Sequence, residues 1–512
     1  MAVRSRRELL RTAGALAVVG AGAGVPQVLA TTSAAAATSK PGPLVATDPD
    51  LHLLRRLTFG PTPQSVAELK RMGRKKWLDH QLAPATIDDS ACTDLIATRY
   101  PQTLLTIPQA RAAIDAFSWD LMFQVGQATI SRATWSKRQL FEVMVDFWSN
   151  HLNVTNPSDG VWDSRHHYDR VVIRKHALGR FEDMLVASAT HPAMLAYLNN
   201  NESTKDAPNE NYGRELLELH SVGVDGGYNE KDMYQSALIM TGFGTDYDTG
   251  QFLYSAEDHY TGPVKVMGFR RPNPTGSGGY DVGLAYVRYL ANHPSTAQRI
   301  ATKLCQRFVS DVPPPRLVKH LADVYLAHGT AIAPVLRELI GSASFLNSTG
   351  KKVRRPFEDL VATLRVLGYK PDASGTQGMQ GLYWMSGDLG QTPLSWPQPN
   401  GYPDEASSWQ SAGGVLARWN SHLSLAAHWW PSTLRQPELL TLLPTKLPAT
   451  YGAFVDALAS RLVFRHLTLA HRHAVLTFLD RSASDPVDSQ ITGWRLPYLV
   501  ALILDTPYHA LR

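Results

Sequence analysis

Apolar residues recur at intervals of three and four along almost the whole chain, and this spacing limits the folds that it can adopt. Leu51, Leu54 and Leu57 begin the pattern, which is that of amphipathic helices. The same period predicts helices over about 107–128, 136–152, 164–188, 210–222, 230–242, 280–291, 294–309, 316–327, 331–346, 355–368, 411–428, 450–464, 467–480 and 493–505. We therefore expect a mostly α fold, in which residues 50–512 form one large helical globular domain with long loops.

Strand patterns are scarce in this sequence. The best alternation runs from Val264 to Phe269, so we expect at most a small β-hairpin near 250–270. Two long stretches, 244–279 and 372–410, look irregular, and no repeat of fixed period is present. Long loops in compact domains are uncommon and often functional, so these two stretches are the first places to seek a binding surface.

The first 37 residues have the pattern of a twin-arginine export signal. Arg6 and Arg7 stand before two leucines, an uncharged stretch rich in Ala, Gly and Val runs from Thr12 to Ala30, and four alanines end at Ala37. Small residues at that point suit a signal peptidase. We predict a signal peptide over residues 1–37, a linker over 38–49, and a protein that is exported folded and is then secreted or associated with the cell envelope.

A membrane anchor is the alternative for the same segment, because about 20 apolar residues can span a bilayer. Several glycines make this stretch only weakly hydrophobic, as twin-arginine signals tend to be. No other window approaches the length and apolarity of a span. We expect no stable membrane span once the signal is removed.

Charge and cysteine content exclude some classes of protein. The formal charge is +5, and removing the signal leaves about +2 with no long Lys/Arg stripe, so nucleic acid is not the expected partner. Cys92 and Cys305 could pair in an oxidising compartment, but Cys305 has the helical surroundings of a small core residue. There is no cysteine motif for a metal.

Several ordered motifs resemble one known family. They are LRRLTFGPT at 54–62, DFWSNH at 146–151, NENYGRELLEL at 209–219, GVDGGY at 223–228, KLCQRFV at 303–309, RPFE at 355–358, and the segment from Gly390 through Trp396 to Pro403. The chain thus resembles the bacterial family called domain of unknown function 1800, over about residues 50 to 430 or beyond. The resemblance implies an exported, helix-rich protein, often encoded beside an exported relative of the sulfatase and phosphatase superfamily, which becomes a candidate partner. It implies no reaction and no cofactor, and the cofactor content stays unknown.

One motif departs from the family's pattern. The family tends to show His-Asp followed by Gly and Lys, whereas this chain has His259, Tyr260, Gly262 and Lys265. The aspartate is either displaced to Asp258 or lost, so no role is carried over for it.

The predicted helix over 136–152 carries a stripe of polar residues. Glu142, Asp146 and Asn150 follow at intervals of four and share one face, and His151 stands at the helix end. Such a group could coordinate a metal, with His151 as a possible ligand, or hold a general acid and base close together. A solvated face with an end-capping histidine is the alternative. Neighbouring aromatic side chains would favour a pocket, since desolvation raises the pKa of a carboxyl.

A second group lies on the predicted helix over 210–222. Asn211, Glu215 and Glu218 share a face, and Arg214 faces Glu218. Two carboxylates beside an arginine could form an acid/base pair or an ion-pair network. The sequence lacks the Glu-x-x-His spacing of di-iron sites, and it lacks the usual zinc-protease, nucleophile-elbow, phosphate-loop and dinucleotide motifs.

The two irregular stretches supply candidate binding residues. His259 and Lys265 flank Gly262 and could bind an anionic group, although a structural histidine with a solvated lysine fits as well. Trp396 and Tyr402 lie among Pro, Gly and Asn. Aromatic faces suit sugar rings, but loop aromatics can also plug a helical core.

Three classes of function follow from these residues. The first is a hydrolase acting on an extracellular or envelope polymer such as a glycan, with Glu215, Glu218 and Asp146 as catalytic carboxylates and Arg214 or His151 orienting them. The second is a metal- or cofactor-dependent redox enzyme folded before export. The third is a non-catalytic partner or scaffold of a secreted enzyme. The residues expected to bind substrate are Asn211, His259, Lys265, Trp396 and Tyr402.

Overall fold

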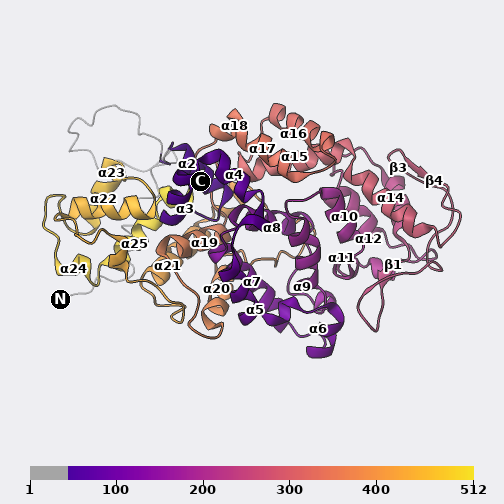
Figure 1. Ribbon diagram of the computed structural model, residues 1–512, viewed down its shortest axis with the longest axis horizontal. Helices are drawn as coiled ribbons and strands as arrows, with labels where there is room; N and C mark the ends of the chain where they lie inside the picture. The colour runs from indigo at the N-terminus through magenta and orange to yellow at the C-terminus, as the bar shows by residue number, and fades with distance from the viewer. Residues whose placement is uncertain (1–43, 46) are drawn as a thin grey trace, which may run out of the picture.

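The computed structural model describes residues 44–45 and 47–512 and confirms the mostly α fold (Figure 1). The predicted signal peptide over residues 1–37 lies outside the described residues. The first half of the chain contains α2 (Pro49–Leu57), α3 (Pro63–Met72), α4 (Arg74–Gln81), α5 (Ser90–Arg99), α6 (Ile107–Ala113), α7 (Asp120–Trp135), α8 (Gln139–His151), α9 (Arg165–Tyr168), α10 (Phe181–Ala189), α11 (Pro192–Tyr197), α12 (Glu210–Glu215) and α13 (Glu230–Met240).

The second half is also helical. It contains α14 (Gly279–Ala291), α15 (Pro294–Phe308), α16 (Pro315–Ala327), α17 (Ile332–Gly341), α18 (Ala343–Leu346), α19 (Pro356–Leu367), α20 (Gln377–Asp388), α21 (Ala412–Ala426), α22 (Tyr451–Leu462), α23 (Leu469–Phe478), α24 (Ser489–Thr492), α25 (Leu496–Leu504) and α26 (Pro507–Ala510). Most of these helices follow the predicted ranges within a few residues.

Some predicted helices are broken in the structure. The range 107–128 is divided into α6 and α7, and Phe117 between them has a positive φ of 64°, which a continuing helix does not allow. The range 164–188 passes from α9 into a π-helical segment, Asp169–Arg174, before α10 begins. Periodicity reports the buried face, which continues across such breaks, so it does not locate them.

Helix α20 was not predicted, because it lies inside the stretch 372–410 that we interpreted as irregular. Glycines along this helix weaken its sequence signal. They have a packing role, since a Cβ at Gly381 would lie only 2.8 Å from the Cβ of Pro431. Helix α20 also packs against α7, where Gly126 leaves room for the ring of Tyr383.

The described strands form two short antiparallel hairpins. β1 (Phe243–Thr245) pairs with β2 (Phe252–Tyr254), and β3 (Val264–Val266) pairs with β4 (Phe269–Arg271). The sequence predicted at most one small hairpin near 250–270. The structure has the hairpin β3–β4 in that range and a second hairpin, β1–β2, just before it. Both hairpins lie at the end of the molecule opposite to helices α22–α25 (Figure 1).

Helix α19 lies in the middle of the molecule, and all its residues except Arg365 are buried (Figure 1). The end of the chain returns to the same region. The backbone N–H of Arg512 donates to Lys352 O at 2.9 Å, and the backbones of Val353 and Leu511 form an antiparallel bridge. The carboxyl-terminal residues therefore belong to the core around the start of α19.

The cysteines and the helix lengths bear on two points raised by the predicted export. Cys92 and Cys305 are both buried and free, so they do not form the disulfide that the sequence left open. No helix in the described part of the chain is long and apolar enough to cross a membrane.

Candidate functional site

A cavity of about 330 Å³ lies where α8, α15, the start of α19 and the loop after α20 meet. Three of the residues selected from the sequence, Asp146, Trp396 and Tyr402, line it together. The wall also includes side chains that the sequence analysis did not select: Lys303, Gln306, Arg307, Arg355, Asp404 and Glu405.

Asp146 is held by two guanidinium groups. Its Oδ2 accepts a short hydrogen bond from Arg355 and lies 3.6 Å from Nη2 of Arg307. The side-chain amide of Asn150, one turn later on α8, donates to the carbonyl of Asp146 at 2.8 Å. The carboxylate is thus a fixed anion that positions the two arginines at the cavity wall.

Behind the cavity, Glu358 on α19 binds three arginines. It accepts hydrogen bonds from Arg307, from Arg355 at 3.3 Å and from Arg512 at 2.8 Å. Burial opposes ionisation of this carboxyl, but the three guanidinium groups together hold the pKa of Glu358 well below its usual value. The ionised carboxylate therefore joins α15, α19 and the end of the chain.

Asp404 forms the opposite side of the same network. It lies 3.7 Å from Arg307 Nη1 and 3.1 Å from the amine of Lys352. The Nε atoms of Arg307 and Arg355 are buried and have no hydrogen-bond partner among the described residues. An unpaired buried N–H is costly, so these guanidinium groups still have donor capacity beside the cavity.

Lys303 contributes an amine to the cavity without a carboxylate partner. Its Nζ lies 3.1 Å from Nδ1 of His151, whose Nε2 lies 3.1 Å from the carbonyl of His220. Burial, assisted by the positive charge of Arg299 and opposed by Asp404, lowers the pKa of Lys303 to about 7. An amine that titrates near neutral pH can act as a general acid or base.

The aromatic wall of the cavity comes from the loop after α20. The rings of Trp396 and Tyr402 lie 5.0 Å apart, and the ring of Trp409, which lines a different cavity, lies 6.0 Å from that of Tyr402. The backbone N–H of Tyr402 donates to Oδ1 of Asn150 at 3.0 Å. The loop is thereby fixed to the end of α8, which carries Asp146.

A comparison of the sequence with models of protein families identifies the family of this chain. The model of the family described as "Protein of unknown function (DUF1800)" matches residues 52–511. The chain belongs to this family. The searches of curated proteins and of solved structures found no match to this chain.

In this DUF1800 protein the other carboxylates selected from the sequence lie outside the cavity wall. Arg214 pairs with Glu210 at 3.5 Å, Glu218 at 3.8 Å and Glu230 at 3.6 Å, which is an ion-pair network. Burial and the nearby Glu218 raise the pKa of Glu215, and its Oε2 is buried without a hydrogen-bond partner in the part of the chain that the structure describes. A catalytic role for Glu215 and Glu218 stays a prediction.

The remaining candidates have structural contacts in the DUF1800 fold. The amide of Asn211 donates to Leu198 O at 3.3 Å, near the start of α12. His259 is buried, with Nδ1 2.8 Å from Thr241 O and Nε2 3.2 Å from Asn273 Oδ1, so it links the two hairpins. Lys265 is exposed on β3, whereas His259 is buried.

His151 was selected as a possible metal ligand, and both its ring nitrogens have protein partners. Glu142, from the same polar stripe, makes a bidentate pair with Arg174 at 2.7 and 3.0 Å. The stripe on α8 is therefore divided between two ion-pair networks.

The sequence contained a signal for the residues that we missed. Lys303 and Arg307 are four apart on one helical face, and Arg355 directly precedes the proline that begins α19. The segments 303–309 and 355–358 contributed to the family resemblance, but no site residue was predicted from them. A cationic pair inside an otherwise apolar motif should have indicated a buried anion partner, because buried charges are paired.

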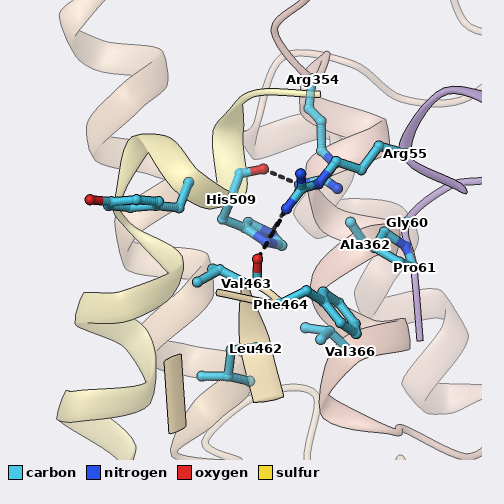
Figure 2. A pocket seen from close by; sticks show the side chains of 11 residues that line it. Arg55, Gly60, Pro61, Arg354, Ala362, Val366, Leu462, Val463, Phe464 and His509 are labelled. Carbon is cyan, nitrogen blue, oxygen red and sulfur yellow. Dashed lines mark hydrogen bonds between the residues drawn. The ribbon is translucent and has the colours of Figure 1, made fainter. Parts of the chain in front are cut away.

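A separate, very small cavity between the central helices shows how closely they pack. Figure 2 shows Arg354 donating to His509 O and Arg55 donating to Val463 O beside Gly60 and Ala362. Its volume of about 10 Å³ has room for one water molecule at most. This cavity is not a ligand site.

The loop that carries Tyr402 depends on a glycine. Gly401 has a φ of 71°, and a Cβ there would lie 2.0 Å from the carbonyl oxygen of Asn150. We expect Gly401→Ala to cost about 1–3 kcal/mol and to move the aromatic wall away from α8. Thermal unfolding and tryptophan fluorescence would measure both effects. Gly413→Ala is the control, since a Cβ there meets no atom within 4 Å, and equal behaviour of the two variants would contradict the expectation.

Proposed function

We propose that this DUF1800 protein is an exported hydrolase that acts on an extracellular or envelope polymer, and that a glycan segment of the polymer binds in the cavity of Asp146 and Lys303. The observation that carries the proposal is the meeting, in one cavity, of paired aromatic rings with an amine whose pKa is about 7. Aromatic faces bind sugar rings, and an amine with this pKa can transfer protons at neutral pH.

The proposal gives each part of the cavity a task. Trp396 and Tyr402 hold the sugar ring, and the neutral amine of Lys303 accepts a proton from the attacking water, whose oxygen forms a bond to the carbon of the scissile bond. The bond from that carbon to the leaving oxygen breaks, and the protonated amine returns the proton to the leaving oxygen. Arg307 and Arg355 stabilise the negative charge that develops on the leaving oxygen, as fixed donors in a dry site do. Asp146 and Asp404 are positioning residues, because their carboxylates already bind the arginines and Lys352.

This proposal differs from the hypothesis based on sequence alone, in which Glu215, Glu218 and Asp146 were the catalytic carboxylates. Glu215 and Glu218 are not part of the cavity wall, whereas Asp146 and Lys303 are. Glu405 also lines the cavity and is exposed, so it is the carboxylate to test beside Lys303. Export through the predicted signal over residues 1–37 and partnership with an exported sulfatase or phosphatase relative remain parts of the proposal.

The two other classes receive less support at this cavity. A metal bound to His151 would have to displace Lys303 or the carbonyl of His220 from the ring nitrogens. Burying an amine without a carboxylate partner disfavours its charged form. A non-catalytic scaffold would gain nothing from such a group, whereas an enzyme can use it to transfer protons.

The test is a panel of envelope and extracellular polymers incubated with the mature protein, with released fragments detected by mass spectrometry. We expect Trp396→Ala to lower kcat/KM by about 2- to 13-fold, because loss of one stacking surface costs about 0.5–1.5 kcal/mol. Trp494→Ala is the matched control, since Trp494 is exposed and does not line the cavity. Release of no fragment from any polymer, or equal loss in both variants, would contradict the proposal.

A further inference from the structure

Three buried side chains from distant parts of the chain meet beside α19, away from the cavity of Asp146. They are Asp359 on α19, His422 on α21 and His509 on α26. One potential ligand atom from each lies within 4.8 Å of the others, and no other such group of three His, Cys, Asp or Glu occurs in the described part of the chain.

The three side chains of this cluster lie nearly as close together as the ligands of one metal ion. Nε2 of His422 is hydrogen-bonded to Oδ2 of Asp359 at 2.8 Å, and Nε2 of His509 lies 3.6 Å from Oδ1 of the same carboxylate and 3.1 Å from the hydroxyl of Thr363. Ligands bound tetrahedrally at about 2.0–2.1 Å from zinc are about 3.3 Å apart. An ion between the three groups would therefore replace the His422–Asp359 hydrogen bond and the Thr363 contact, with a separation of His422 and Asp359 by about 0.5 Å.

The surroundings orient His422 as metal ligands are oriented. Its Nδ1 lies 2.8 Å from Oδ1 of Asp505, while Nε2 faces Asp359. A carboxylate on the far nitrogen of a histidine fixes the ring and raises its basicity as a ligand. His509 is fixed through its backbone, because its carbonyl accepts a hydrogen bond from Arg354 (Figure 2).

The cluster also has access to a ligand. Asp359, His422 and Asp505 line a second cavity of about 400 Å³, whose other walls are mainly apolar, including Trp409, Val415 and Leu502. Three protein ligands beside a cavity is the arrangement of catalytic metal sites, which keep a coordination position open.

We propose that Asp359, His422 and His509 form a binding site for one divalent transition-metal ion, such as Zn²⁺, whose open coordination position faces this second cavity. Two imidazoles and one carboxylate suit zinc or iron, whereas Mg²⁺ and Ca²⁺ prefer oxygen ligands throughout. The site is independent of the proposed hydrolase cavity.

The charged side chains around the cluster indicate which ligand the open coordination position of the metal ion binds. Arg354 donates to the carbonyl of His509. Arg418, which lines the cavity, is more than nine-tenths buried; its Nη2 donates to Trp409 O, and its Nε has no hydrogen-bond partner among the residues described. The ion and the two arginines together outweigh the carboxylates of Asp359 and Asp505. The open position therefore takes an anionic group, and the apolar walls select a small anion with an apolar body.

The test begins with the mature protein purified from its own host and analysed for metals, followed by removal of metal with a chelator and titration with Co²⁺ and Zn²⁺. We expect about one metal ion per chain, a visible Co²⁺ spectrum that Zn²⁺ abolishes, and a melting temperature that rises with Zn²⁺ concentration, as binding to the folded state requires. The elemental analysis identifies the native metal.

Variants locate the ion. His422→Gln and His509→Gln should abolish the Co²⁺ spectrum, and Asp505→Asn, which keeps all three ligands, should weaken metal binding about 10–100-fold. His471→Gln is the matched control, because His471 lines the same cavity outside the cluster. The proposal is overturned if the wild-type chain purifies without metal and binds Co²⁺ no more tightly than His422→Gln does, since the cluster is then a metal-free ion pair.

Discussion

Glu358→Gln is expected to lower the free energy of unfolding by about 3–5 kcal/mol at neutral pH, which is the usual cost of breaking a buried ion pair. The amide keeps the shape of the side chain but removes the charge that three buried arginines share. These arginines come from α15, from the start of α19 and from the end of the chain. The variant therefore weakens the contact between three parts of the chain, and chemical denaturation would measure the loss.

The difference in the free energy of unfolding between the wild type and Glu358→Gln should depend on pH. The pKa of Glu358 is well below its usual value in the folded protein, and an unfolded glutamate has a pKa of about 4.3. A carboxyl with a lowered folded pKa contributes its full stability above the unfolded pKa and loses it as the pH falls toward the folded pKa. The difference between wild type and Glu358→Gln should therefore be largest above about pH 5 and shrink as the pH falls below 4.

A surface carboxylate provides the control for this prediction. Asp323 accepts a hydrogen bond from Lys319 at 2.8 Å, and both side chains are more than half exposed. Asp323→Asn should cost no more than about 1 kcal/mol, because exposed ion pairs contribute little. If Glu358→Gln is as mild as Asp323→Asn, the buried network does not stabilise the fold in the way we describe.

The helical fold could be predicted from the sequence because each helix buries one face, and a buried face leaves a local period of three and four. Helix α19 shows this well, since its apolar residues and its initial Pro356 are both visible in the sequence. Helix α20 was missed because its glycines reflect close contacts with Pro431 and Leu434, which are distant in sequence. A signal that depends on a distant neighbour cannot be read from a local window.

The same distinction explains which parts of the site were found. Trp396 and Tyr402 stood out as loop aromatics, and Asp146 stood out in a polar stripe, so each had a local signal. The pKa of Lys303 is lowered mainly by burial among the elements that pack around α15, while Arg299, one turn earlier on the same helix, assists. The cluster of Asp359, His422 and His509 joins residues up to 150 positions apart. Their chemistry depends on tertiary contacts that no single segment contains.

Lys303→Met is expected to lower kcat/KM on the polymer identified by the screen by about 10²–10⁴-fold, the usual contribution of a general base. In the wild type, kcat/KM should rise with pH through about 7, where the amine of Lys303 loses its proton. Lys303→Arg keeps the positive charge but has no neutral form near this pH, so it should lose both activity and the rise. Retention of the pH profile in either variant would remove Lys303 from the reaction.

Stability measurements separate this catalytic loss from damage to the fold. An unfolded lysine has a pKa of about 10.4, whereas burial lowers the pKa of Lys303 to about 7 in the folded protein. Between these two values the unfolded state binds more protons, so this residue makes the wild-type protein more stable as the pH rises from 7 to 10. Lys303→Met removes that slope and also removes a charge that the fold disfavours. The methionine variant should therefore be inactive yet at least as stable as the wild type at pH 6, a combination that a merely disrupted fold would not produce.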